Sequence, residues 1–299
     1  MRNDLHVGCT IKVLAILALA TVARGQRTAA YVGVASHSAQ PSLSGQSLPG
    51  CKPPMLGTST LRERNRQQSE WMTGLGLAKQ VDQHTKQITD REIIQYLNDI
   101  EGQLVEHSKL DECFVVKVID DPEPNAYSLP GGFLYLTTGM LRIAGNESQL
   151  AAALAHETAH VNARHLTRLE QRRRVWGRLA LLAGPVGYAA RRYLGPVLTM
   201  KMVRDSELDA DGRALQYYIS AGYDVREFTA LLQSASLEQD ESQSLRDRLL
   251  DDHPPTSTRI RRLKEASDRI SQPRIQAPVN PSEFDRVKAR LPFVKASQD

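Results

Sequence analysis

The stretch "AALAHETAHVNARH", residues 152–165, constrains this chain most, because an alanine-rich helix here carries the pattern H-E-x-x-H. Side chains four residues apart lie on the same face of an α-helix, so His156 and His160 can point at one ion while Glu157 projects beside them. Two neutral imidazoles plus a third protein ligand suit a catalytic zinc ion, whose fourth position is left to water. Because the pattern also occurs by chance in helices whose histidines pack in a core, it needs a third ligand.

The stretch "SELDADGR", residues 206–213, offers that third ligand. Glu207 and Asp211 are four residues apart on a predicted helix and therefore share a face. We expect Glu207 to bind the metal, and Asp211 to hydrogen-bond a ligand histidine and hold its tautomer. Asp209, between them, is expected to be solvated. The competing interpretation is that all these carboxylates are solvated, and their combination with the histidine pair disfavours it.

His165 follows His160 by five residues. At 100° per residue, it lies roughly 140° around the helix from His160. We therefore expect His165 on the helix surface, with Arg164 and Arg168, and not among the ligands.

Four stretches in a fixed order resemble one family of H-E-x-x-H metallopeptidases, which includes the CAAX prenyl protease, HtpX, mitochondrial Oma1 and the periplasmic BepA-type proteases. They are "NAYSLPGGFLYLTTGML", "HETAHVNARH", "SELDADGRA" and "HPPTSTRI". The resemblance implies a gluzincin-type zinc endopeptidase with one Zn²⁺ per chain. It implies His156, His160 and Glu207 as ligands, with Glu157 as general base.

The resemblance also gives a meaning to residues outside the ligand set. "NAYSLPGG" resembles the family's edge strand, to which a peptide substrate would add, with Asn125, Ala126 and Tyr127 offering backbone groups and a pocket wall. His253 would cap the open zinc position in a resting state or bind substrate. Arg259 would help to neutralise the oxyanion of the transition state. The residues alone would also allow an ordinary strand and turn, and a histidine in a surface turn.

The sequence differs from some branches of this family in two respects. The sequence lacks the multiple apolar spans of the prenyl protease and HtpX branches, and it lacks the helical-repeat tail of BepA. It is therefore expected to resemble the small, exported, single-domain bacterial members.

The apolar pattern predicts an α+β domain. Strands are predicted at residues 113–120, 125–129 and 133–138, and Pro130-Gly131-Gly132 turns the chain between the last two. The pairs Thr89 with Glu92 and Asn146 with Gln149 have the spacing of helix capping boxes. We expect a mostly helical, gluzincin-type domain with a sheet of three or four strands, one of them a substrate-binding edge strand, and the metal between two helices.

An apolar region at residues 175–200 leaves alternatives open. Its longest uncharged run, residues 179–190, is too short to span a bilayer as a helix. Gly184-Pro185 and Gly195-Pro196 are expected to break a helix. The region is interpreted as a packed helical hairpin, a mobile flap, or a loop that touches a membrane.

The N-terminal part is expected to lie outside the folded domain. A charged start and the apolar run "VLAILALATVA" predict an export signal over residues 1–25, with an uncleaved anchor as the alternative. Residues 26–60 are rich in Ser, Gly, Pro and Gln and predict a flexible linker. The metallopeptidase domain is then residues 61–299, working in the bacterial periplasm or cell envelope. There Cys51 and Cys113 could pair or remain thiols.

The net charge is small. The chain carries +4, of which residues 1–25 supply three basic residues against one acidic residue, so the remainder carries +4 − 2 = +2. This is too little to argue for nucleic acid as a partner, although peripheral contact with a membrane stays open. The expected partners are protein and peptide substrates, and the sequence does not determine the oligomeric state.

These predictions combine into one leading function, a zinc-dependent endopeptidase that hydrolyses peptide bonds of unfolded or misassembled cell-envelope proteins. The alternative is a latent or non-proteolytic zinc protein that binds such proteins as a chaperone does. Glu157 speaks against the alternative, because a purely structural zinc site needs no base.

Overall fold

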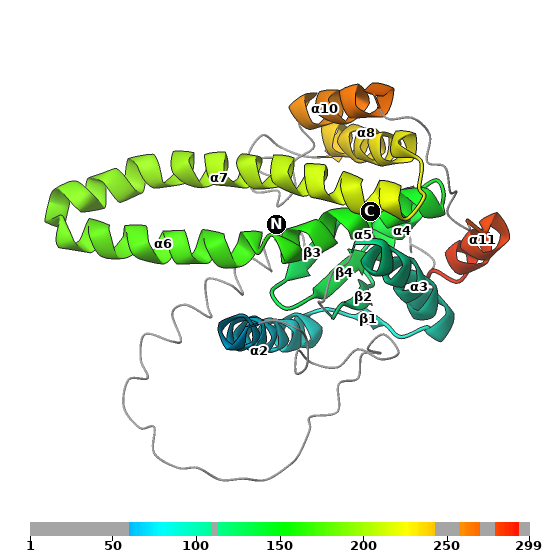
Figure 1. Cartoon of the computed structure of the whole chain (residues 1–299), viewed down its shortest axis with the longest axis horizontal. Coiled ribbons are helices and arrows are strands. Elements are labelled where there is room, and N and C mark those ends of the chain that lie inside the picture. Colours follow the sequence, from blue (N-terminus) through cyan, green and yellow to red (C-terminus); the bar gives the residue numbers. More distant parts are fainter. Residues whose placement is uncertain (1–59, 109–112, 243–256, 270–278, 293–299) are drawn as a thin grey trace, which may run out of the picture.

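A computed structural model describes residues 60–108, 113–242, 257–269 and 279–292 (Figure 1). The predicted signal, the linker before Thr60, Cys51 and His253 lie outside these residues. The elements are α2 (Leu61–His84), β1 (Gln87–Ile88), α3 (Arg91–Ser108), β2 (Val115–Ile119), β3 (Ala126–Leu129), β4 (Phe133–Thr137), α4 (Thr138–Ile143), α5 (Glu147–Asn162), α6 (His165–Leu182), α7 (Gly184–Ser220), α8 (Val225–Ser242), α10 (Ser257–Arg269) and α11 (Pro281–Ala289). Helices dominate and accompany one small sheet, which confirms the predicted α+β class.

The sheet has four strands in the order β1-β2-β4-β3, so β3 lies at an edge. β2 pairs with β4 in parallel, and β3 pairs with β4 antiparallel, with Tyr127 opposite Tyr135. The three predicted strands are confirmed. β1 was not predicted, because its two residues are too few to show a period in the sequence.

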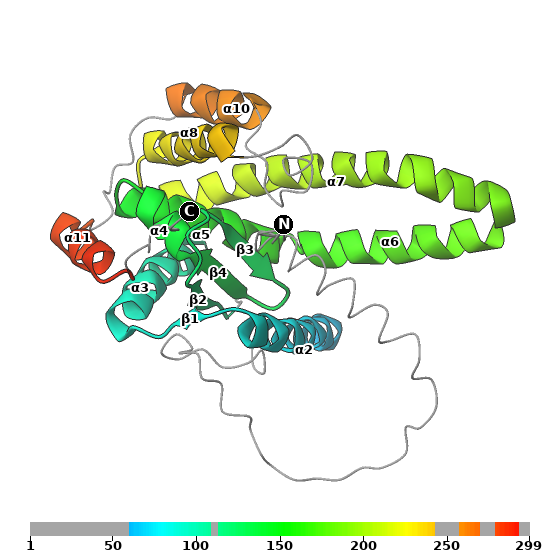
Figure 2. The ribbon, with the colours of Figure 1, turned by 180° about the vertical axis from the view of Figure 1, so that it is seen from behind.

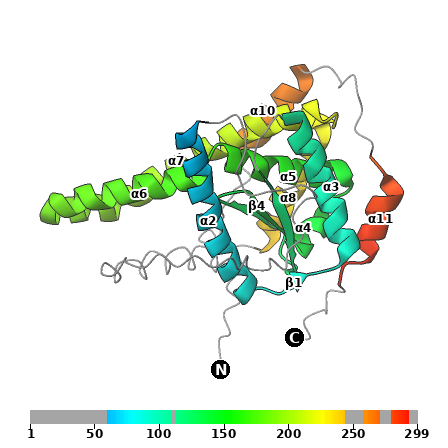
Figure 3. The same cartoon turned by 60° about the horizontal axis from the view of Figure 1, so that its bottom comes forward.

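Helices cover both faces of the sheet, and Figure 3 shows the strands between α2 and α3. Successive side chains of a strand point to opposite faces, and all five residues of β4 are buried. Phe133 and Tyr135 pack with Ala78 and Val81 of α2. Leu134 and Leu136 pack on the other face, in the cluster that includes α3 and α5. Burial on both faces holds the sheet in the middle of the domain.

The turn between β3 and β4 requires glycine. Gly131 and Gly132 have φ angles of 80° and 91°, in the left-handed region that residues with a side chain rarely adopt. A Cβ atom on Gly132 would lie 2.0 Å from the carbonyl oxygen of Cys113. The predicted turn therefore also serves as a packing contact for the residues that lead into β2.

One of the two predicted helix caps is present in the structure, and the other is replaced by its neighbour. Asn146 caps α5, because its Oδ1 accepts a hydrogen bond from the backbone N–H of Gln149 at 3.0 Å. The prediction of Thr89 as the cap of α3 is wrong: Asp90 Oδ1 accepts the hydrogen bond from Glu92 N, also at 3.0 Å. A carboxylate is favoured at the positive end of a helix, and here it is also held by Arg290 at 2.7 Å.

Helix α5 runs through the centre of the domain. Its alanines at 151, 152, 155 and 159 are at most 1% exposed. Small side chains on several sides of one helix let neighbours approach closely, and α3, α7, α8 and β3 all pack against α5. The alanine-rich composition thus places the histidine pair at the centre of the fold.

Helices α6 and α7 form a long arm that projects from the body, as Figures 1 and 2 show from opposite sides. The chain reverses at Gly184, whose φ is 59°, and Pro185 is accommodated in the first turn of α7. The expected break at Gly195-Pro196 is wrong, since α7 continues through both residues. Helix α6 packs along α7, and tertiary contacts of this kind can override the cost of a proline in a helix. Within the described part of the chain, no helix has the length and apolar character needed to cross a membrane.

Candidate metal centre

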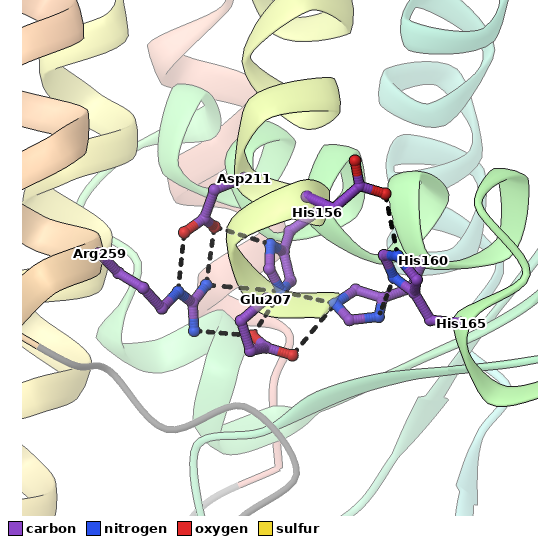
Figure 4. Close-up of polar contacts among 7 residues, drawn as sticks. His156, His160, His165, Glu207, Asp211 and Arg259 are labelled. Atoms are coloured by element: carbon purple, nitrogen blue, oxygen red, sulfur yellow. Dashed lines mark hydrogen bonds and ion pairs between the residues drawn. The ribbon is translucent and has the colours of Figure 1, made fainter. Parts of the chain in front are cut away.

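The structure brings together two side chains of α5 and one of α7 (Figure 4). The Nε2 atoms of His156 and His160 are 3.1 Å apart. Glu207 lies across both rings, with Oε2 3.2 Å from His156 Nε2 and Oε1 3.3 Å from His160 Nε2. His156 and Glu207 are buried and His160 is partly buried.

These separations suit a single small ion. Ligand atoms at the corners of a tetrahedron, each about 2.0–2.1 Å from a zinc ion, lie about 3.3 Å from one another. The second ring nitrogen of each histidine faces another partner, so the two Nε2 atoms and the carboxylate converge on one point. The residues present therefore fit a metal.

Asp211 holds His156 in this orientation. Its Oδ1 atom lies 3.1 Å from His156 Nδ1. A carboxylate at Nδ1 keeps the ring proton there and leaves the Nε2 lone pair for a metal. This is the contact expected for Asp211 from the sequence.

Arg259, on α10, lies against the two carboxylates of α7 (Figure 4). It is 3% exposed, and its Nη1 is 2.8 Å from Glu207 Oε2. Its Nε and Nη2 donate to the two oxygens of Asp211, each at 2.8 Å. This fork-shaped contact orients Glu207 and Asp211. Arg259 Nη2 also lies 3.5 Å from His156 Nε2, and the oxyanion contact expected for Arg259 stays a prediction.

The charge of Asp211 is stabilised strongly. Burial would raise the pKa of its carboxyl, but hydrogen bonds from Arg259 and His156 outweigh burial and lower the pKa to about 2. Asp211 is therefore a carboxylate at neutral pH and accepts a hydrogen bond from the Nδ1–H group of His156.

His165 corrects an expectation. It is buried, and its Nδ1 lies 3.1 Å from His160 Nδ1. Its Nε2 lies 3.1 Å from Asp209 Oδ2, which also accepts a hydrogen bond from Arg213 Nε at 2.9 Å. Burial lowers the pKa of His165 against the opposing effect of Asp209, so the neutral ring can accept at Nδ1 and donate from Nε2. His165 and Asp209 thus support His160 as Asp211 supports His156.

The backbone explains why the surface position predicted for His165 is wrong. The estimate of roughly 140° assumed one continuous helix. However, α5 ends at Asn162, and Arg164 adopts the left-handed conformation with φ 56° and ψ 40°. This turn brings the ring of His165 next to the ring of His160. The sequence signal that could have predicted this position is the combination of His165, a third histidine near the motif, with Asp209 in "SELDADGR".

Glu157 lies between the two histidines of α5 and is 1% exposed. The next residue, Thr158, donates a hydrogen bond from its hydroxyl to Glu101 Oε1 of α3 at 2.7 Å. Burial raises the pKa of Glu101 to about 8, against the opposing hydrogen bond from Thr158. A neutral carboxyl group therefore anchors the back of the helix that carries the histidines.

Of the three residues expected to offer backbone groups at the edge strand, only Ala126 directs them outward. The N–H of Thr137 donates to the carbonyl of Asn125 at 3.0 Å, and the N–H of Asn125 donates to Thr137 Oγ1 at 2.9 Å. Alternate residues of an antiparallel strand face the same neighbour, so Tyr127 also faces β4, whereas Ala126 and Ser128 direct their N–H and C=O groups to the outer edge.

Tyr127 does not provide a wall on the metal side of the sheet. Its ring stacks on Tyr135, with centroids 5.1 Å apart, in the cluster beneath α2. The side chain of Ala126 lies on the other face, in the cluster that includes α5.

Comparison with known proteins agrees with this arrangement. The chain matches the model of Peptidase family M48 over residues 89–267, more than half of its length. It is 30% identical over 218 residues to the beta-barrel assembly-enhancing protease of Escherichia coli K12, covering 68% of this chain and 44% of that protein. It is 56% identical over 48 residues to the mitochondrial metalloendopeptidase OMA1 of Schizosaccharomyces pombe, covering 16% of this chain and 14% of that protein.

The chain therefore spans less than half the length of these curated relatives. The matched region includes the two histidines and the glutamate that converge in the structure. The chain belongs to Peptidase family M48, whose members are metal-dependent peptidases.

Proposed function

We propose that this chain is a zinc-dependent endopeptidase that cuts extended segments of cell-envelope proteins, unfolded or misassembled ones above all. One observation carries the proposal. The Nε2 atoms of His156 and His160 and the carboxylate of Glu207 converge within 3.3 Å of one another, at the spacing of three tetrahedral zinc ligands. Two imidazoles and one carboxylate, with a fourth position left to water, are a ligand set of catalytic zinc.

Each residue around this centre has a separate role in the proposed hydrolysis. Zinc, when bound there, supplies Lewis acidity that polarises the scissile carbonyl and lowers the pKa of the attacking water. Glu157 is placed one residue from His156 to take a proton from that water and to deliver it to the leaving amine. Asp211 and His165 hold the two histidine rings, and Arg259 holds Glu207 and Asp211.

The substrate would bind as an added strand along β3. Ala126 and Ser128 direct backbone groups to this edge, and β3 packs beside the helix that carries the histidines. An extended peptide is recognised through main-chain hydrogen bonds, so the enzyme would accept many sequences and depend on local unfolding of its substrate.

We place the protein outside the cytoplasm, in the periplasm or cell envelope and in peripheral contact with a membrane. The export signal predicted over residues 1–25 supports this. Cys113 is disulfide-bonded, which suits an oxidising compartment. The name of the Escherichia coli relative, a beta-barrel assembly-enhancing protease, supports envelope proteins as the substrate class.

The test is digestion of casein by the full chain, compared with Glu157→Gln and with Glu106→Gln, a matched change at an exposed glutamate of α3. Each protein is assayed as purified, after chelation and after zinc is restored. We expect the chain and Glu106→Gln to cut casein only with zinc. We expect Glu157→Gln to bind zinc with unchanged stoichiometry and to be inactive.

A chain that holds zinc but cuts neither casein nor other unfolded proteins would overturn the proposal and favour the latent or chaperone-like alternative. His253→Ala would then follow, since the motif "HPPTSTRI" suggests that His253 caps the metal in a resting state. Activity that survives Glu157→Gln would remove Glu157 from the mechanism.

A further inference from the structure

The far end of the arm exposes apolar side chains. Leu181 and Leu182 are 82% and 84% exposed and Val186 is 78% exposed. Three further apolar residues lie just before them on α6 and are more than half exposed, namely Val175, Trp176 and Leu179. We call these six residues the arm tip. Such a concentration of exposed apolar side chains marks a binding surface, whereas single exposed ones need no explanation.

The arm is strongly basic behind this tip and at the start of it. Arg172, Arg173, Arg174 and Arg178 are all exposed. Residues 171–204 contain eight basic residues and no acidic residue, so the remainder of the chain carries 4 − 8 = −4. The small net charge of the whole chain therefore hides a division between a basic arm and an acidic remainder.

We propose that the outer part of the arm tip, from Leu179 to Val186, inserts into the surface of a bilayer that contains anionic phospholipid. The apolar end would enter the boundary between headgroups and acyl chains, while the exposed arginines would contact the phosphates. From Arg178 to the turn at Ala183, α6 rises about 7–8 Å, which matches the depth of roughly 5–10 Å for interfacial helices. Trp176 lies at the level of the arginines, where tryptophan is enriched at membrane interfaces.

The arm is fixed to the body at its root. Arg164, between α5 and α6, pairs with Glu63 and Glu70 of α2 at 2.7 and 3.1 Å. On the other side, α7 continues without interruption into the body, where Ala210 and Ala214 are fully buried. The arm is therefore held in one direction by two helices.

This geometry sets the height of the metal centre above the lipid. Glu207 lies 207 − 184 = 23 residues along α7 from the turn, a rise of about 35 Å. With the arm upright, the centre would cut segments of membrane-attached proteins at that height. Cleavage at that height rests on the proposed peptidase function, whereas insertion of the tip into the bilayer does not.

A second copy of the chain is the competing occupant of the tip. Charge disfavours it, because two arms joined at their apolar tips would bring their exposed arginines together. The same arginines favour an anionic surface.

Trp176 provides the test, since the chain has only one other tryptophan, Trp71. Full-length Trp71→Phe is titrated with phosphatidylethanolamine–phosphatidylglycerol vesicles whose acyl chains carry bromine at different depths. We expect Trp176 fluorescence to shift to the blue and to be quenched most by the shallowest bromines. Vesicles of phosphatidylcholine alone should bind more weakly, and salt should weaken binding to the anionic ones.

The variant pair Leu181→Ser with Leu182→Ser should weaken vesicle binding about tenfold or more, because each buried methylene contributes to the affinity. The matched control is Leu61→Ser with Met72→Ser, two exposed apolar residues of α2, which should bind as the parent does. Both pairs should cut casein in solution at the parental rate. The inactive Glu157→Gln should still bind vesicles, so a failure of the peptidase proposal would be seen separately.

Vesicle binding without quenching of Trp176 would mean that another segment contacts the lipid, and would overturn the proposal. So would vesicle binding that the serine pair leaves unchanged. Sedimentation of the lipid-free chain gives the remaining outcome: a dimer that the serine pair dissociates, together with no vesicle binding, would assign the tip to a second copy.

Discussion

The Nδ1 atoms of His160 and His165 lie 3.1 Å apart, and the far nitrogen of His165 lies 3.1 Å from Asp209. One consistent set of protons satisfies this chain of contacts. His160 donates from Nδ1 to His165, and His165 donates from Nε2 to Asp209. That set leaves His160 Nε2 unprotonated, which is the state a metal ligand requires.

His165→Ala should therefore weaken metal binding by about 10- to 100-fold, as loss of a residue that orients a ligand does. The measurement is competition for zinc with a chelator of known affinity, which does not depend on turnover. His165→Asn keeps a polar group near the Nδ1 position and should recover part of the affinity. His107→Ala, at an exposed histidine of α3, is the control. Equal affinity of the parent and His165→Ala would remove His165 from the support of the metal.

Arg259→Ala should destabilise the folded chain by about 3–5 kcal/mol, because it leaves two buried carboxylates without their cation. The stability of Arg259→Lys should lie between those of the wild type and Arg259→Ala, since an ammonium group cannot make the paired contact of a guanidinium. Urea unfolding of the metal-free proteins measures the effect. If stability is unchanged while kcat falls, Arg259 acts on the oxyanion, as the family resemblance suggested.

Ser128→Pro should raise KM for peptide substrates by about tenfold and leave the fold intact. It removes an N–H that points to the outer edge of β3, and proline is tolerated on edge strands. Loss of one main-chain hydrogen bond with the bound strand costs about 1 kcal/mol or more when its partner stays unpaired. Ser128→Ala keeps the N–H and is the control. An unchanged KM in Ser128→Pro would place the substrate elsewhere.

Glu101→Gln should make the stability of the chain less sensitive to pH. The pKa of Glu101 in the folded chain, about 8, lies above the ordinary value of 4.5, so the folded state keeps a proton that the unfolded state loses. Below pH 4.5 both states are protonated. Between about pH 4.5 and 8 the wild-type chain loses stability as pH rises, because the unfolded state releases this proton first.

The measurement is the free energy of unfolding at several pH values for the wild type, Glu101→Gln and the exposed control Glu106→Gln. The difference between wild type and Glu101→Gln should grow across this range and stop growing above pH 8. Parallel curves for these two proteins would show that Glu101 is ionised in the folded state.

Local sequence patterns predicted the parts of this fold that depend on local rules. The i, i+4 spacing aligned His156 with His160, Asn146 capped α5, and the strands followed from apolar runs bounded by glycine and proline. Asp211 was expected beside a histidine because it shares a helical face with Glu207.

The remainder depends on contacts that no local pattern contains. A single left-handed residue, Arg164, moved His165 from the expected surface to the metal centre. The outward N–H and C=O groups of β3 depend on which of its residues hydrogen-bond β4: Asn125 and Tyr127 face β4, whereas Ala126, as expected, and Ser128 face the outer edge. Helix α7 continues through Pro196 and packs along α6, a tertiary contact that helix propensity alone does not contain.

The position of Arg259 late in the chain has a consequence for the order of events during synthesis. Glu207 and Asp211 come from α7, while their cation arrives only with α10, 259 − 211 = 48 residues after Asp211. A nascent chain that ends before α10 would hold these two carboxylates side by side without the guanidinium that pairs with both of them. The charges of this centre are therefore balanced only once the chain has been made as far as α10.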